Sequence, residues 1–196
     1  MSPEVWSAIF AGGTFVVIAA SAIAALIQLR HLRASNQLSG MITINNLWHD
    51  PRIQAWFDFV RDDLPSKLED PEFRRGILAQ RIDRRVHVEL YAADFWEQIG
   101  GYVKYRLIDE ASFLDLACQQ VVEFWEMLWP VTSARRVRGG PSVYENFEYL
   151  AVLAKRWIAR HPTGAYPNGL ARMSDLDPTL SPQPPETQVA GKNAGV

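Results

Sequence analysis

The stretch VWSAIFAGGTFVVIAASAIAALIQL, residues 5–29, decides how the rest of the chain is organised. It contains no charged residue, and Gln28 is its only strongly polar side chain. Coiled as an α-helix, it would be about 37 Å long at 1.5 Å per residue. Because the hydrocarbon core of a bilayer is roughly 30 Å thick, these residues predict one transmembrane helix that anchors the chain to a membrane.

The residues that flank this stretch argue against two other interpretations and predict an orientation. A cleaved signal peptide has a basic segment before a shorter apolar core, whereas only residues 1–3 and the acidic Glu4 precede this one. A buried helix of a soluble domain rarely has so long an uninterrupted apolar run. Arg30 and Arg33 follow the run, so the positive-inside rule predicts an outside N-terminus and a cytoplasmic C-terminal part.

The composition limits the classes of partner and the number of domains. The chain has 196 residues, a formal net charge of −2 and one cysteine, so we expect no nucleic-acid partner and no intrachain disulfide. We expect three parts. These are a transmembrane anchor with a juxtamembrane helix in residues 1–38, a helical cytoplasmic domain in 39–161, and a disordered tail in 162–196, where proline, glycine and polar residues dominate.

Hydrophobic spacing after the anchor is helical, and no convincing stretch alternates with the period of two that a strand requires. The expected fold is therefore all-α, with the transmembrane helix extending into a small cytoplasmic helical bundle. Helices are expected from the anchor to about residue 49, over 51–63, over 71–107 in one or two pieces, over 110–130, and from a capping box at 142–145 to about 160. Asp50 and Asp109 are expected to cap the helices that follow them.

Residues 84–108 are apolar on nearly every side, which places this segment at the centre of the domain. Gly100 and Gly101 within it lower its helix propensity, and close packing of a neighbouring helix backbone is the expected compensation. Two prolines are expected to interrupt neighbouring helices. The second helix should break at Leu64-Pro65-Ser66, and Pro130 should kink or end the helix that contains it.

No motif for a metal centre or a catalytic site is present in the sequence. A di-iron helical bundle uses two Glu-x-x-His pairs, and this chain has none. Its four histidines are scattered, and the lone Cys118 cannot build a thiolate site. A nucleophile elbow, a P-loop and a dinucleotide-binding glycine motif are also missing. We therefore expect no metal, no cofactor and no enzymatic activity.

Three blocks of sequence resemble a known family. They are DFWEQIGGYVKYRLIDEASF (94–113), VVEFWEMLWPVTSARR (121–136) and YENFEYLAVLAKRW (144–157), and in this order they are similar to a bacterial family of unknown function. Its members have one N-terminal transmembrane helix and a small all-helical cytoplasmic domain. The resemblance covers most of 40–160. It implies the same fold and a place in the bacterial inner membrane, and it implies no reaction.

Five arginines lie close together in the sequence: Arg74, Arg75, Arg81, Arg84 and Arg85. Contact with anionic lipid head groups would contribute about 1 kcal/mol for each basic residue near the surface. A solvated helix face with ion pairs at helical spacing would account for them equally simply. Nucleic acid is not expected, because acidic neighbours dilute the positive charge and no recognition motif is present.

Asp94 and Glu97 lie beside large aromatic residues in the central segment. Unpaired carboxylates are costly to bury, so both should have partners. We expect Arg135 or Arg136 to supply the positive charge, brought back by a reversal of the chain after Pro130. A cluster of this kind is most often structural, and in a cleft it could instead mark a ligand site.

These observations predict a single-span inner-membrane protein, held in the lipid bilayer by Val5–Leu29. Its helical cytoplasmic domain would bind an unidentified protein partner or a second copy of the chain. The alternative is a membrane-tethered binding domain for a small ligand or an anionic lipid, with its polar cluster at Asp94 and Glu97. A cavity lined by converging polar groups would favour the alternative, whereas an exposed apolar face would favour protein association.

Overall fold

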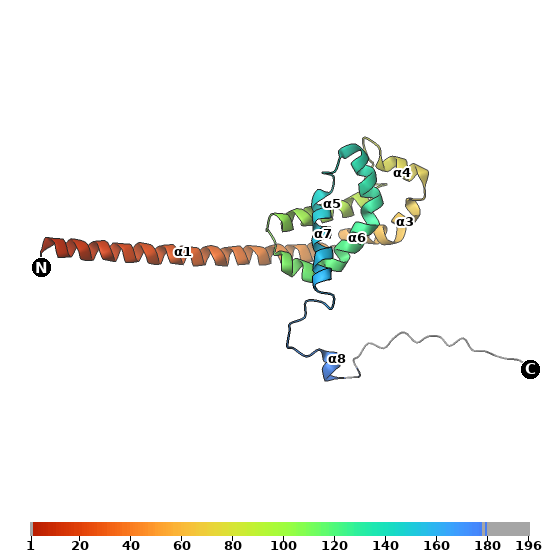
Figure 1. Cartoon of the computed structure of the whole chain (residues 1–196). Coiled ribbons are helices and arrows are strands. Elements are labelled where there is room, and N and C mark those ends of the chain that lie inside the picture. Colours follow the sequence, from red (N-terminus) through yellow and green to blue (C-terminus); the bar gives the residue numbers. More distant parts are fainter. Residues whose placement is uncertain (1, 178, 180–196) are drawn as a thin grey trace, which may run out of the picture. The chain divides into compact units, whose positions relative to one another are not determined.

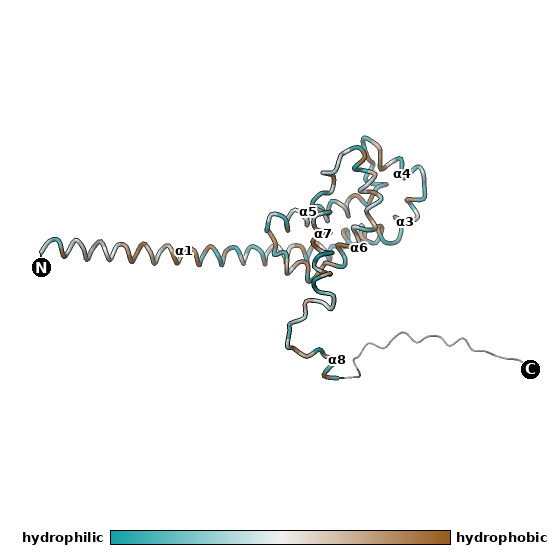
Figure 2. The backbone as a smooth tube through the Cα atoms, in the orientation of Figure 1, coloured by the Kyte–Doolittle hydropathy of each residue, from teal (hydrophilic) through white to brown (hydrophobic). Residues whose placement is uncertain are grey.

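The structure of the chain is a computed structural model that describes residues 2–177 and 179. Helix α1 spans Pro3–Trp48 without interruption and is about 69 Å long at 1.5 Å per residue. Its most apolar window is not buried in the described part of the chain, and α1 is long and apolar enough to cross a membrane. Figure 2 shows that the white and brown part of α1 gives way to more hydrophilic residues before the helix enters the domain.

The last turns of α1 pack into the helical domain, so the expected continuation of the anchor helix to residue 49 is confirmed. Ile44 is buried, and the Trp48 ring lies 5.3 Å from that of Trp96, edge to face. One turn earlier, Gly40 faces the Ile108 side chain so closely that a Cβ at position 40 would lie 2.9 Å from it. The end of α1 is therefore packed as part of the domain, and it also connects the domain to the apolar segment.

Helix α2 (Pro51–Asp58) continues directly into the π-helical turn η1 (Phe59–Asp63) and helix α3 (Leu64–Lys67). The predicted break at Leu64-Pro65-Ser66 is therefore wrong. Pro65 has no N–H, and its ring would clash with the fourth preceding carbonyl in a regular helix. The wider π turn, in which the Leu64 N–H bonds to the Phe59 carbonyl, accommodates the proline without ending the helix.

Two helices account for the segment predicted as helical over 71–107. Helix α4 covers Pro71–Ile77, residues 78–88 form turns, and helix α5 covers Glu89–Lys104. Most residues of α5 are buried, including Trp96, which is completely inaccessible to solvent. The Trp96 ring stacks on Phe57 and Phe147 at centroid distances of 5.8 and 6.0 Å. The predicted central position of this segment is confirmed.

Helix α6 spans Glu110–Gly139 and contains Pro130. Asp109 begins it as predicted, because its carboxylate accepts the Ser112 N–H at 2.8 Å. The prediction that Pro130 could end this helix is wrong, and the chain reverses only after Gly139. Pro130 lies on the exposed side of α6, where water can bond to the carbonyl that loses its helical partner.

Helix α7 spans Glu145–Arg160 and packs against both α5 and α6 (Figure 1). It ends beside His161 as predicted, but the predicted capping box at 142–145 does not form. Tyr144 is the residue before the helix, has a left-handed φ of 57°, and provides no side-chain cap. The described residues contain no strand, and the predicted all-α fold is confirmed.

Helices α5 and α7 approach each other closely at Gly100. A Cβ at this position would collide with the carbonyl oxygen of Asn146, whereas the nearest atom to a Cβ at Gly101 would be 4.0 Å away. The expected compensation for the glycine pair, close packing of a neighbouring backbone, is confirmed for Gly100.

The chain divides into two compact units, residues 1–162 and 163–196. The described part of the second unit contains the short helix α8 (Met173–Leu176). About half of the predicted disordered tail, residues 178 and 180–196, lies outside the described residues.

Candidate functional site

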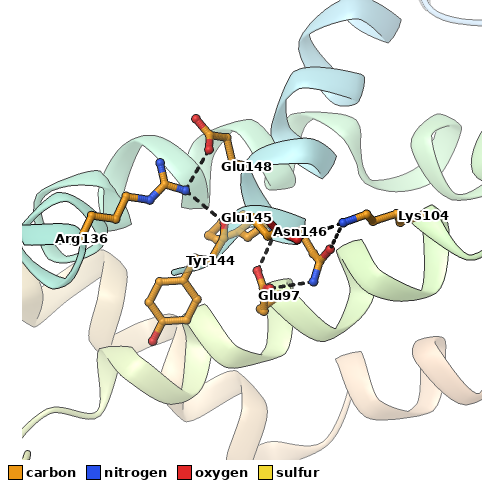
Figure 3. A network of polar contacts seen from close by, with 8 residues as sticks. Glu97, Lys104, Arg136, Tyr144, Glu145, Asn146 and Glu148 are labelled. Atoms are coloured by element: carbon orange, nitrogen blue, oxygen red, sulfur yellow. Dashed lines mark hydrogen bonds and ion pairs between the residues drawn. The ribbon is translucent and has the colours of Figure 1, made fainter. Parts of the chain in front are cut away.

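Glu97 uses both carboxylate oxygens to bind the start of α7 (Figure 3). Its Oε1 accepts a hydrogen bond from Asn146 Nδ2 at 2.7 Å, and its Oε2 accepts one from the backbone N–H of Phe147 at 2.9 Å. The first N–H groups of a helix have no partner within the helix and attract negative charge. Glu97 therefore caps α7 from a different helix, in place of the cap that the preceding Tyr144 does not provide.

Asp94 lies one turn before Glu97 on α5 and also has partners, as predicted. It pairs with Arg84 and accepts a hydrogen bond from the Tyr144 hydroxyl at 3.3 Å. Burial, together with the negative charge of Asp94, raises the pKa of Tyr144. The phenol thus stays protonated and remains a hydrogen-bond donor to Asp94.

Arg135 and Arg136 are not the partners of these carboxylates, contrary to the prediction. Arg136 donates to the Val143 carbonyl at 2.9 Å and to Glu148 Oε2 at 2.8 Å. Arg135 donates to the Ile77 carbonyl at 3.4 Å. The prediction placed both arginines in a chain reversal after Pro130, whereas they lie within α6, which continues to Gly139.

Side chains from two helices, α5 and α6, nevertheless converge on the segment Val143–Glu148 (Figure 3). Glu97 and Arg136 contact it as described, and Lys104 Nζ donates to Glu145 Oε1 and Asn146 Oδ1, both at 3.0 Å. This network fixes a left-handed turn that is uncommon for a residue with a side chain. The carboxylates of this network accept hydrogen bonds from donors of the chain itself. Of the two alternatives for the polar cluster, this arrangement favours a structural role over a ligand site. Sequence reasoning missed the residues of α7 in it, because only the helix crossing brings them together.

A buried pair that the sequence did not indicate lies at the start of α5. His87 Nδ1 and Glu89 Oε1 are 2.9 Å apart, and the two residues are 2% and 0% exposed. Burial raises the pKa of Glu89, and the hydrogen bond with His87 acts in the opposite direction. Gly76 makes room for the imidazole, since a Cβ there would collide with its Nε2. The pair connects the turns of 78–88 to α4 and α5.

No group of three or more His, Cys, Asp or Glu side chains is placed to hold a metal ion within the described part of the chain. Cys118 is half-buried, and burial raises the pKa of its thiol. A raised pKa favours the thiol over the reactive thiolate.

The five clustered arginines belong to the region of α4, which contacts the last turns of α6. Arg138 in the last turn of α6 donates to the Leu78 carbonyl, whereas Gly40 of α1 meets Ile108 just before α6 begins. Helix α6 has 30 residues, so about 45 Å of helix separates these two places. Among the cluster, Arg75 pairs with Glu72 at 3.3 Å, as on a solvated face.

Two cavities lie where α1 meets the domain. An apolar groove of about 460 Å³ lies between the end of α1 and the first turns of α6, with Ile42 and Leu116 among its lining residues. A polar cavity of about 440 Å³ lies nearer the apolar part of α1 and is lined by Arg33, Gln37 and the residues around Arg106.

Residues 15–157 match the family described as "Domain of unknown function (DUF4760)". This match covers more than half of the chain and confirms the resemblance to a family of unknown function. No curated protein and no solved structure matched the chain.

Proposed function

The chain belongs to the DUF4760 family, and we propose that it is a single-span protein of the bacterial inner membrane whose helical domain faces the cytoplasm and associates with a second copy of the chain. The length and apolar character of α1 support the span. Glu4 before the span and Arg30 and Arg33 after it support the cytoplasmic position of the domain, through the positive-inside rule.

The observation that supports the association is an exposed apolar surface, which continues along α1 beyond the membrane-spanning part. Leu38 and Ile42 are 63% and 53% exposed, and Leu116 of α6 is 73% exposed. Leu38 and Ile42 are four residues apart and share one face of α1. Ile42 and Leu116 both line the 460 Å³ groove, which the described residues leave open. Contiguous exposed apolar surface outside a membrane is typical of an interaction site.

A second copy is the occupant that fits this surface. Two copies anchored in one membrane have the same orientation, so their α1 helices present Leu38 and Ile42 at the same height. The groove has no aspartate, glutamate, lysine or arginine in its lining, and the face of α1 that bears Leu38 and Ile42 offers an uncharged surface to it. The same patch on both partners would form an isologous, self-complementary interface.

Disulfide crosslinking in native membranes tests this association. In a Cys118→Ser background, Leu38→Cys should give a crosslinked product at twice the mass of 22.2 kDa when the membranes are oxidised. The matched control is Asn36→Cys, which is exposed but lies about 160° around the helix from Leu38. Absence of the product for Leu38→Cys, or equal yields at both positions, would contradict the proposal.

The orientation has a separate test. A reporter that is active only in the cytoplasm should function when it is fused after Ile158, near the end of α7. Activity of a reporter that requires the opposite side of the membrane, fused at the same position, would show that the domain lies outside.

A further inference from the structure

We propose that the polar cavity between α1 and the connection from α5 to α6 binds the phosphate of an anionic phospholipid. The cavity has a volume of about 440 Å³, and its basic lining residues are Arg33, Lys104 and Arg106. This site differs from the arginine cluster near α4, and it rests on the membrane anchoring proposed above.

The position of Arg33 along α1 places the cavity at the level of lipid phosphates. Arg33 follows Leu29, the last residue of the apolar stretch, by four residues, which is about 6 Å along the helix axis. The polar layers raise the thickness of a bilayer from about 30 Å to about 40–45 Å, or by roughly 5–8 Å on each side. When Val5–Leu29 spans the hydrocarbon core, Arg33 therefore lies in the head-group layer.

Two of the three cations are available to a ligand. Lys104 is already bonded to Glu145 and Asn146. Arg33 and Arg106 are exposed, and within residues 2–177 and 179 neither guanidinium has an ion-pair partner. Two carboxylates also line the cavity, but that of Asp109 is engaged in capping α6, which leaves Glu110 as the opposing charge.

The backbone at Arg106 gives an independent reason to look for a role of its side chain. Arg106 has a left-handed φ of 57° at the end of α5. Its N–H bonds to the Val103 carbonyl at 3.0 Å, and the Leu107 N–H bonds to the Tyr102 carbonyl at 2.9 Å, which is the Schellman arrangement. Glycine is the usual residue at this position, because it has no Cβ to clash. An arginine there supplies a planar guanidinium, whose geometry suits a phosphate.

The same feature provides a variant that removes the charge and favours the fold. Arg106→Gly places the preferred residue at a left-handed position, and Arg33→Gln shortens an exposed side chain of α1. We would purify the full chain in mild detergent and measure binding of phosphatidylglycerol, phosphatidylcholine and inorganic phosphate by native mass spectrometry. The wild-type chain should prefer phosphatidylglycerol, and the double variant should bind it about thirtyfold more weakly, which corresponds to about 1 kcal/mol for each basic residue.

The matched control is Arg81→Gln combined with Arg85→Gln, which makes the same change of net charge near α4. This control should keep the wild-type preference for phosphatidylglycerol. An equal loss in the control would mean that net charge alone attracts the lipid, and would overturn the site. Displacement of the lipid by millimolar inorganic phosphate would identify a soluble phosphate ligand, and would also overturn it.

A nitroxide label distinguishes failure of this site from failure of the anchor. Val17→Cys in the Cys118→Ser background places the label in the middle of the apolar stretch, and in vesicles it should be accessible to oxygen and protected from a water-soluble relaxing agent. A water-exposed label would overturn the membrane anchoring itself. A lipid-exposed label together with unchanged phosphatidylglycerol binding in Arg33→Gln/Arg106→Gly would overturn only the lipid site.

Discussion

The carboxylate of Glu97 in α5 accepts the backbone N–H of Phe147, the third residue of α7, at 2.9 Å. An N-terminal cap usually comes from the residue that precedes the helix, which here is Tyr144. Tyr144 instead turns the chain with a left-handed backbone and directs its hydroxyl to Asp94. The beginning of α7 is thus defined by a contact between helices that are about 50 residues apart in the chain.

Loss of this cap should destabilise the domain. Glu97→Ala removes a cap and leaves the Phe147 N–H without its acceptor, so the free energy of unfolding should fall by about 2 kcal/mol. Urea unfolding of the full chain in detergent, followed by the helical circular dichroism signal, measures the change. The control is Glu126→Ala, which breaks an exposed pair with Lys155 and should cost less than about 0.5 kcal/mol. Equal losses in the two variants would contradict the role of Glu97.

The two adjacent glycines of α5 should respond to alanine in opposite directions. Gly100→Ala forces a methyl group against the Asn146 carbonyl, and we expect a loss of about 3 kcal/mol through overpacking of α5 against α7. Gly101→Ala has space for the methyl group and should gain up to about 1 kcal/mol from helix propensity. Thermal unfolding of both variants under identical conditions provides the comparison. Similar melting temperatures for the two would show that the helices do not approach at Gly100.

Trp96 should contribute more to stability than Trp125, although both lie in long helices of the domain. Trp96 is fully buried, whereas Trp125 is partly exposed beside Trp129. Trp96→Ala should lower the free energy of unfolding by about 3–5 kcal/mol and unfold much of the domain, with a clearly smaller loss for Trp125→Ala. Near-ultraviolet circular dichroism and urea unfolding of the two variants would establish the order. A larger loss for Trp125→Ala would place the centre of the core on α6.

The stability of the domain should depend on pH through Glu89. Burial raises the pKa of this carboxyl in the folded chain above its ordinary value of 4.5. Its contribution to stability is therefore fully present below pH 4.5 and is lost as the pH rises through the pKa of the folded state. Glu89→Gln, which stays neutral, should become more stable relative to the wild-type chain as the pH rises from 4.5 toward neutrality.

Unfolding of both proteins in urea at a series of pH values between about 4 and 8 measures this difference. If the difference in the free energy of unfolding between the two proteins is the same at every pH, the hydrogen bond with His87 cancels the effect of burial on the pKa of Glu89 completely. His87→Phe keeps a ring beside Phe73, whose centroid lies 4.5 Å from that of the imidazole. The His87→Phe variant should make the stability depend more steeply on pH, because it loses the hydrogen bond that counteracts the effect of burial on the pKa of Glu89.

Features that depend on neighbouring residues could be predicted from the sequence alone. The apolar stretch 5–29 predicts the membrane-length part of α1, because length and absence of charge are sufficient for that inference. Asp50 and Asp109 begin α2 and α6 as predicted, since a capping side chain bonds to N–H groups only two or three residues away. The central position of α5 also followed from its own residues, because a helix that is apolar on nearly every side must be covered.

The accommodation of the prolines and the pairing of the charges depend on tertiary packing. Pro65 and Pro130 each disfavour a helix locally, by about 3 kcal/mol, but packing of the residues on both sides keeps the helices continuous. His87 and Glu89 are only two residues apart, and what the tertiary structure decides is their burial. The partners of Glu97 depend on which helices cross. Spacing along one helix cannot specify such contacts, because they join groups that only the packed domain brings within hydrogen-bonding distance.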